Sequence, residues 1–128
     1  MSERTVVEAS GAPEAAGPYS HATLHGGVLY CSGQVSLDPE TGELIDGGPG
    51  EQTTRCLRNL EAICEEAGTS LSRALMVSVF TTDLAAGPEI NAAYGEAFAA
   101  EPPARAMVGV AALPLGASVE IAAVVAVG

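Results

Sequence analysis

The sequence lacks lysine altogether, and its five basic side chains are all arginines. A lysine amine is needed to form an internal Schiff base with pyridoxal phosphate, and a lysine also completes the phosphate-binding loop of Walker-type nucleotide enzymes. The sequence therefore excludes both of these classes.

Positive charge is scarce as well, with five basic residues against 16 acidic ones and a net charge of −11. A nucleic-acid-binding surface needs a field that attracts phosphates, and this balance produces the opposite field. We therefore expect no nucleic-acid partner, and the balance disfavours a ribonuclease.

Long apolar runs and paired cysteines are also missing. The uncharged apolar stretch at residues 106–119 is interrupted by Gly109, Pro114 and Gly116 and is too short to span a bilayer. No apolar segment follows Met1 as a secretion signal would require. Three cysteines without a CxxC spacing are typical of reduced, buried thiols, so we expect a cytoplasmic protein without a membrane partner.

No metal or cofactor is expected. His21 and His25 are four residues apart, but no acid or cysteine pattern completes a ligand set. The GxSxG, HExxH and GxGxxG motifs are absent too. Cys31 has no histidine placed by the sequence to activate it as a nucleophile.

The alternation of apolar and polar residues predicts one domain over residues 1–128 with the order β-β-β-α-β-α-β-β. Hairpin-like neighbours at each end favour a mixed sheet with both helices on one face, which is an α+β fold. The expected strands are residues 4–8, 22–24, 28–37, 74–80, 103–110 and 119–127, and the expected helices are 51–67 and 88–99. A hairpin turn is expected at Gly26-Gly27, between the second and third strands, and Gly68 is placed to end the first helix. Each helix has an apolar stripe, formed in the first by Thr53, Leu57, Leu60, Cys64 and Ala67 and in the second by Ile90, Ala93, Tyr94, Ala97 and Phe98. A hydrophobic content of 48% with 4% aromatics suits either a well-filled core or a sheet face buried against other copies of the chain.

Arg105 and Glu120 each interrupt an otherwise apolar strand. Arg105 follows a Pro-Pro-Ala corner. It is either a surface arginine at a strand end or a residue at a pocket rim whose planar guanidinium group binds a carboxylate. Glu120 is either half of a structural ion pair with Arg105 or a proton acceptor facing a cavity.

Three further segments carry polar groups suited to a ligand. Tyr19 follows a Gly-Pro pair, and Ser32 and Gly33 lie inside a strand, where they mark either a harmless bulge or a close approach of backbone to ligand. Asn91 lies beside the apolar stripe of the second helix and can cap, face solvent or donate to a ligand.

Together these segments resemble the RidA family of reactive intermediate deaminases, also called YjgF or L-PSP. The match extends almost from end to end, and its residues occur in the family's order and spacing. They are Ala12-Pro13, Gly17 to Ser20, Ser32 to Gln34, Asp38 to Gly42, Gln52-Thr53, Asn59-Leu60, Ala67-Gly68, Phe80 to Asp83, Asn91, Pro103 to Arg105, Ala112 to Pro114, Gly116-Ala117 and Val119 to Ile121.

The resemblance implies a chorismate-mutase-like protomer that assembles as a homotrimer, with the sheets packed inward and a cleft at each subunit boundary. It also implies a cofactor-independent hydrolase that converts 2-aminoacrylate, 2-iminopropanoate or 2-iminobutanoate into a 2-oxo acid and ammonia. An iminium carbon is already electrophilic, so orientation and a proton acceptor suffice for its hydrolysis.

On the matching positions, Arg105 is expected to bind the substrate carboxylate and Glu120 to activate or position water. Tyr19, Ser32, Gly33, Asn91 and the backbone at Met107 would shape the cleft. Two alternatives stay open, namely a non-catalytic module that binds or senses small carboxylates and a family member that serves a specialised pathway with another imine. Some residues depart from the family's usual ones: Met107 replaces a small residue, His21 a glutamine, Gly109 and Ala122 acids, and Leu115 a lysine.

Overall fold

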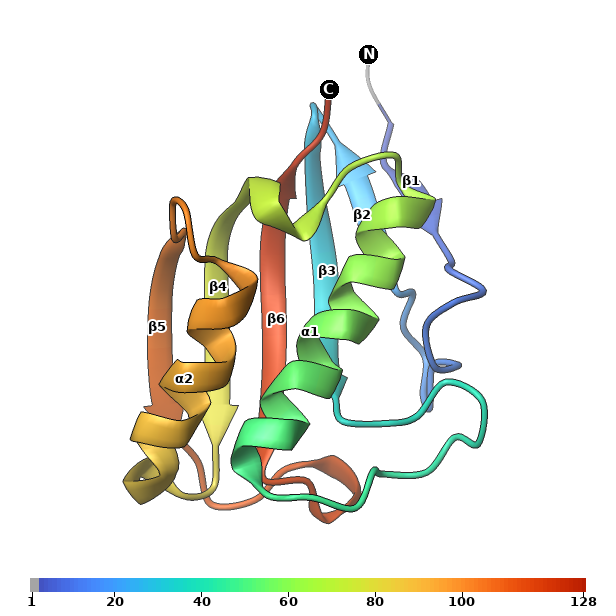
Figure 1. The fold of residues 1–128 in the computed structure, drawn as a ribbon. Helices are drawn as coiled ribbons and strands as arrows, with labels where there is room; N and C mark the ends of the chain where they lie inside the picture. Colours follow the sequence, from blue (N-terminus) through green and yellow to red (C-terminus); the bar gives the residue numbers. More distant parts are fainter. Residues whose placement is uncertain (1–2) are drawn as a thin grey trace.

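The computed structural model describes residues 3–128, which form a single sheet covered on one face by two helices (Figure 1). Its strands are β1 (Thr5–Val7), β2 (Ala22–His25), β3 (Val28–Val35), β4 (Ala74–Thr81), β5 (Ala104–Gly109) and β6 (Val119–Ala126), and its helices are α1 (Pro49–Glu66) and α2 (Gly87–Ala97). The predicted order of elements and the α+β class are confirmed.

The strands lie side by side in the order β1-β2-β3-β6-β4-β5, so the chain's last strand occupies the middle of the sheet. All neighbours are antiparallel except β4 and β5, which are parallel and joined through α2. Gly26 and Gly27, with φ of 59° and 77°, form the predicted two-residue turn between β2 and β3. β5 is consequently an edge strand, with α2 beside it.

Helix α1 begins at Pro49, two residues before the predicted start, because proline fits the first turn, where a helix needs no N–H donor. Gly68, at φ 79°, follows its end as predicted. The predicted inner stripe of α1 is largely correct, with Thr53, Leu57 and Leu60 buried against the sheet.

The core lies between the helices and one face of the sheet. Its largest fully buried apolar side chains are Leu29, Leu60, Ile63, Val77, Val79, Ile90, Val119, Ile121 and Val125. The opposite face of the sheet is uncovered in the protomer, and Tyr30 and Val108 are 50% and 45% exposed there. The fold therefore contains both features that could explain the high apolar content, namely a filled core and an apolar sheet face that is open.

Two buried amide side chains of α1 hold the loops at one end of the sheet. Asn59 donates to the carbonyl oxygens of Val35 and Leu37 at 3.3 and 3.0 Å, which secures the end of β3. Gln52 accepts from the N–H of Ser118 at 2.9 Å, which secures the entry to β6. Since buried polar groups without partners are costly, these bonds position both loops tightly.

Neither helix among residues 3–128 has the length and apolar character needed to cross a membrane.

Candidate active site in two halves

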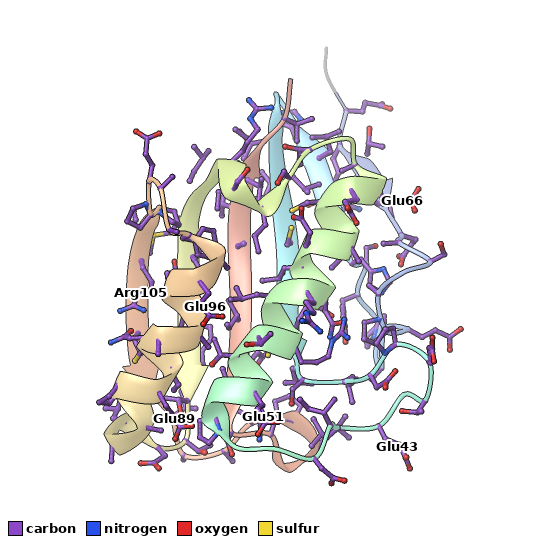
Figure 2. The ribbon with its side chains drawn as sticks, viewed as in Figure 1. Glu43, Glu51, Glu66, Glu89, Glu96 and Arg105 are labelled. Atoms are coloured by element: carbon purple, nitrogen blue, oxygen red, sulfur yellow. The ribbon has the colours of Figure 1, made fainter. Side chains whose placement is uncertain are left out.

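Arg105 lies on edge strand β5 and points toward α2 (Figure 2). Its Nη1 donates to Oδ1 of Asn91 at 2.7 Å, and its guanidinium carbon lies 4.8 Å from the ring centre of Tyr94. The side chain is exposed, and no carboxylate lies within 4.0 Å of it among the described residues. Arg105 is therefore an oriented cation whose remaining N–H donors are available to an anion.

Tyr94 supports this arginine through its ring and not through its hydroxyl. The ring is buried and packs on Phe98, with the two centroids 4.7 Å apart, while the hydroxyl has no hydrogen-bond partner. Burial raises the pKa of the Tyr94 phenol, an effect that the neighbouring Arg105 opposes. The phenol therefore stays neutral near physiological pH and acts as a flat platform under the guanidinium.

We expect Tyr94→Phe to keep Arg105 in place and to match or slightly exceed the wild-type thermal midpoint, because the lost hydroxyl makes no hydrogen bond. Tyr94→Leu removes the platform and should weaken binding of a small carboxylate about tenfold. Calorimetric titration with a 2-oxo acid measures both variants. Equal weakening by the two substitutions would contradict the platform role.

Glu120 lies on β6 and faces the open side of the sheet. The carboxylate is half-buried, and burial raises its pKa above the usual range for glutamate. A carboxyl group with a raised pKa accepts and returns protons more readily near neutral pH than an exposed one. Glu120 therefore has the electrostatic character of a general base.

A hollow of about 260 Å³ surrounds this carboxylate and is lined by Tyr19, Ser32, Gly33, Pro114 and Glu120. A second hollow of about 250 Å³ shares four of these residues and extends beneath the loop that precedes β2. Ser32 donates through its hydroxyl to the Ser20 carbonyl at 2.7 Å, and the Tyr19 hydroxyl accepts from the Ala16 N–H at 3.2 Å. The phenolic proton of Tyr19 thus remains available to a ligand.

Gly33 is required because the Glu120 carboxylate lies directly over it. The pairing of β3 with β6 shifts register between Cys31 and Gln34, so the predicted bulge is present. A Cβ built on Gly33 would lie 3.0 Å from Cδ of Glu120. The sequence left open whether Ser32 and Gly33 mark a bulge or a close approach of the backbone. The structure has both, because the bulge brings the backbone of Gly33 close to the Glu120 carboxylate.

We expect Gly33→Ala to displace the Glu120 carboxylate and to reduce any activity that depends on it by about tenfold or more, because the added methyl group would overlap the carboxylate in its present position. Gly95→Ala is the matched control, since a Cβ on Gly95 meets no atom within 4 Å. The effect is measured as steady-state turnover of the two variants, at a temperature where thermal melts show that both are folded. Wild-type turnover in Gly33→Ala would show that the close approach is irrelevant.

The structure does not bring Arg105 and Glu120 together within one chain. Arg105 pairs with Val77 and Glu120 with Phe80, on opposite sides of β4. Val77 belongs to the helix-covered face, whereas Glu120 alternates with the buried Val119 and Ile121 and so faces the other way. The alternative of an ion pair between these two residues inside the protomer is therefore wrong.

The predicted site residues, joined by Tyr94, accordingly fall into two groups. Tyr19, Ser32, Gly33 and Glu120 form one, here called the carboxylate half. Asn91, Tyr94 and Arg105 form the other, here called the guanidinium half. Met107 lies next to the second group on β5, but its side chain packs against the core, so only its backbone remains to serve a ligand.

Sequence reasoning missed Tyr94 and Pro114. Tyr94 was assigned only to the apolar face of α2, although its spacing of three residues from Asn91 places both on one side of a helix. Pro114 begins the turn Pro114–Gly116 between β5 and β6, where Leu115 has φ 60°, a value uncommon for a residue with a side chain. No residue pattern in the sequence predicts that this turn lies beside Glu120.

The three thiols take no part in either half. All are buried and free, as expected. Burial raises the pKa of Cys56 to about 12, and a hydrogen bond with Cys31, together with burial, raises the pKa of Cys64. Thiols in such surroundings stay protonated and unreactive.

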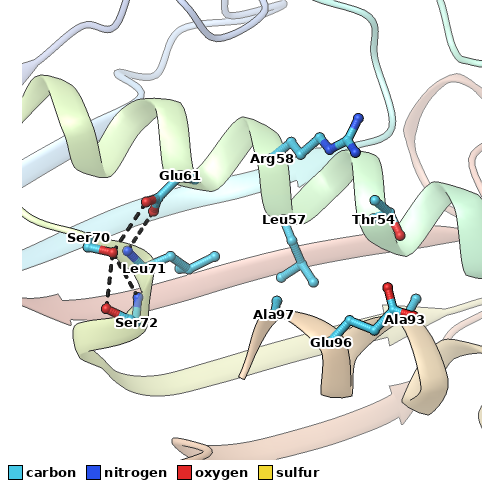
Figure 3. Close-up of a pocket in the computed structure, with 10 residues that line it drawn as sticks. All are labelled: Thr54, Leu57, Arg58, Glu61, Ser70, Leu71, Ser72, Ala93, Glu96 and Ala97. Atoms are coloured by element: carbon cyan, nitrogen blue, oxygen red, sulfur yellow. Dashed lines mark hydrogen bonds between the residues drawn. The ribbon is translucent and has the colours of Figure 1, made fainter. Parts of the chain in front are cut away.

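A separate groove of about 340 Å³ lies between α1 and α2 (Figure 3). One of its two carboxylates, Glu61, accepts from the Leu71 N–H at 2.6 Å and from the Ser70 hydroxyl at 3.2 Å. Glu61 therefore secures the turn before β4, and none of the predicted site residues lines the groove.

Comparisons with known proteins agree with this architecture. The family model described as Endoribonuclease L-PSP matches residues 9–127. The human 2-iminobutanoate/2-iminopropanoate deaminase is 38% identical over 121 residues, which cover 94% of this chain and 88% of the human one. RidA from an Antarctic Psychrobacter superposes with a TM-score of 0.92 at 39% identity, covering 96% of this chain and 99% of that one. E. coli TdcF with bound serine gives a TM-score of 0.90 at 33% identity, covering 97% and 99%.

The fold and the comparisons first define the class, a mixed α+β chain of the L-PSP/Rid fold. The relatives then define the family. The chain belongs to the RidA (YjgF) family, as its motifs predicted.

Proposed function

We propose that this protein is a hydrolytic deaminase of reactive 2-enamine and 2-imino acids, with 2-aminoacrylate, 2-iminopropanoate and 2-iminobutanoate as the substrate class. The observation that carries the proposal is the guanidinium half: an arginine held by Asn91 and Tyr94 with no carboxylate partner in the described chain. A cation fixed in this way is suited to a small planar carboxylate, because the fork of N–H donors is already oriented. Family membership and the name of the human relative support the same class.

The two halves divide the reaction between them. Arg105 binds the carboxylate of the 2-iminium acid, and Glu120 accepts a proton from a water molecule as that water's oxygen bonds to the iminium carbon. Glu120 then returns the proton to the nitrogen of the tetrahedral intermediate. The carbon–nitrogen bond breaks, ammonia leaves, and loss of the remaining hydroxyl proton yields the 2-oxo acid. An enamine substrate first takes a proton on its terminal carbon, which converts it into the iminium.

Because the halves lie on opposite faces of the sheet, the proposal includes a homotrimer in which a guanidinium half of one copy meets a carboxylate half of the next. The open sheet face supports such packing, since Tyr30 and Val108 expose apolar surface there. Cyclic symmetry brings two different surfaces of identical chains together at every boundary. Each trimer would then contain three equivalent clefts.

The test of the chemistry is a trapping assay. An amino-acid oxidase generates the imine, semicarbazide traps it, and an active deaminase suppresses the adduct by converting the imine first. We expect suppression in proportion to the protein added. Binding of a 2-oxo acid without any suppression would favour the alternative of a non-catalytic carboxylate sensor, and suppression with only a bulkier imine would favour a specialised-pathway enzyme.

The test of the shared cleft is complementation. Arg105→Ala and Glu120→Gln each spoil a different half, so co-expressed mixed oligomers should regain activity at about a quarter of their boundaries if the chains assort at random. Each variant alone provides the control. If mixed oligomers form and stay as inactive as the single variants, the cleft between copies is wrong.

A further inference from the structure

His21 connects the two ends of the loop that walls the carboxylate half. Its Nδ1 accepts from the backbone N–H of Ala9 at 2.9 Å, and its Nε2 lies 2.7 Å from the carbonyl oxygen of Pro13. The ring is buried, with 4% of the residue exposed. The His21 carbonyl also accepts from the N–H of Ser32 at 2.9 Å, so the residue joins the loop to the bulge in β3.

These partners specify one form of the ring. A backbone N–H can only donate, so Nδ1 must carry a lone pair. A proline carbonyl can only accept, so Nε2 must carry the proton. Only the neutral Nε2–H tautomer satisfies both bonds, because a proton on Nδ1 would face the Ala9 N–H and leave it without an acceptor.

The loop tied by this ring supplies one side of the hollow. Pro13, Glu14, Ala16 and Tyr19 all line it. The Tyr19 end of the loop is held to β3 independently of the ring, because the Ser32 hydroxyl donates to the carbonyl oxygen of Ser20 at 2.7 Å. The loop's other backbone bonds in the described structure are local, from Ala12 to Ala9 and from Tyr19 to Gly17. The position of the Pro13 side of the wall therefore depends on the two bonds of the imidazole.

Glu8 gives the ring an alternative partner. Its carboxylate Oε2 lies 3.4 Å from Nδ1, and it is the only carboxylate within 4.0 Å of the ring nitrogens among residues 3–128. The Glu8 side chain is 57% exposed, so solvent screens the charge of its carboxylate, and this carboxylate has no ion-pair partner in the ring while the imidazole is neutral. On the side of α1, the loop meets an uncharged residue, because Gly11 lies against the Cβ of Ala62. A proton on Nδ1 would thus exchange the Ala9 amide for the Glu8 carboxylate.

We propose that His21 is a positioning residue for the active site, which holds the Pro13 side of the wall in place only while its ring is the neutral Nε2–H tautomer. The consequence for catalysis rests on the proposed function, whereas the tautomer and the loop contact do not. A proton on Nδ1 would remove the acceptor of the Ala9 amide, so protonation of this ring should loosen the wall.

The experiment compares the wild-type protein with His21→Gln and His21→Leu. Glutamine carries one acceptor and one donor and does not titrate, while leucine offers neither. At about pH 8 we expect His21→Gln to keep kcat/KM within about twofold of wild type and His21→Leu to lose about tenfold, mostly as a higher KM. At an acid pH where the nitrogen-15 spectrum shows the ring doubly protonated, the ratio of wild-type to His21→Gln activity should be several-fold lower than at about pH 8, because the titration of Glu120 is common to both proteins and cancels.

Two spectroscopic measurements on the assembled wild-type protein are independent of turnover. Nitrogen-15 correlation spectra should show the Nε2–H tautomer at about pH 8, and hydrogen exchange at the Ala9 amide should accelerate as the ring gains its proton. A constant activity ratio across pH, or an Ala9 amide indifferent to ring protonation, would overturn the proposal. If no variant deaminates an imine, the function is wrong, and the two spectra still decide whether His21 holds the loop, even where His21→Leu fails to fold.

Discussion

Arg105→Ala is expected to abolish deamination, with kcat/KM reduced by about 100-fold or more, while the oligomer persists. The alanine variant loses a charge-assisted, two-pronged contact worth roughly 3 kcal/mol, and about 1.4 kcal/mol corresponds to each tenfold change. Stability should change little, because the guanidinium is exposed and its partners are the Asn91 amide and the Tyr94 ring. The trapping assay measures activity, and light scattering after size-exclusion chromatography measures assembly.

Two companion variants sharpen this expectation. Arg105→Lys keeps the charge but loses the planar fork, so it should retain only a small part of the activity. Arg73→Ala is the matched control, since Arg73 is an exposed arginine that donates to the carbonyl of Gly128, outside either half of the site. Full activity in Arg105→Ala would refute the role of this residue in holding the substrate carboxylate.

Glu120→Gln is expected to cost about 100-fold in kcat with a smaller change in KM, because an amide cannot accept the proton of the attacking water. The change is nearly isosteric, so the close packing over Gly33 should survive. Glu14→Gln is the control, because Glu14 also lines the hollow but lies on its exposed loop. A wild-type kcat in the Glu120→Gln variant would show that another group accepts the proton.

The same variant should be the more stable protein at alkaline pH. Burial raises the pKa of Glu120 in the folded state above its unfolded value, so the folded chain binds more protons between the two values. Stability therefore decreases as the pH rises through the folded pKa and is regained as the pH falls below it. We expect the thermal midpoint of Glu120→Gln to exceed that of the wild type at about pH 8, and the difference between the two midpoints to shrink as the pH is lowered to about pH 4. The absence of any such trend would mean that burial of this carboxylate is not a cost to the fold.

The fold was predictable because its patterns are local. Alternating apolar residues marked the strands, a three-and-four spacing marked α1, and Gly26-Gly27 marked the hairpin turn. The errors lie at element ends. There Asn59 and the isolated bridge between Leu37 and Leu44 take up backbone groups that the sequence pattern assigned to a longer β3. Such choices depend on contacts between distant parts of the chain, and no single stretch encodes them.

The candidate site was predictable only as a list of residues. Composition singled out Arg105 and Glu120, because a charge inside an apolar strand needs a reason. Their placement on opposite faces depends on pairing register, since Arg105 pairs with Val77 and Glu120 with Phe80, which face opposite ways on β4. Tyr94 and the loop fastened by His21 become visible only once side-chain contacts are known.

The division of the charges between the two faces of the sheet has a consequence for how activity depends on concentration. In the proposed trimer, a chain diluted below the dissociation constant of the assembly would possess no complete cleft, so turnover per chain should decline on dilution faster than thermal stability does. The proposed catalysis would then belong to the boundary between molecules, and a freshly made, unassembled chain would stay inactive until it binds other copies.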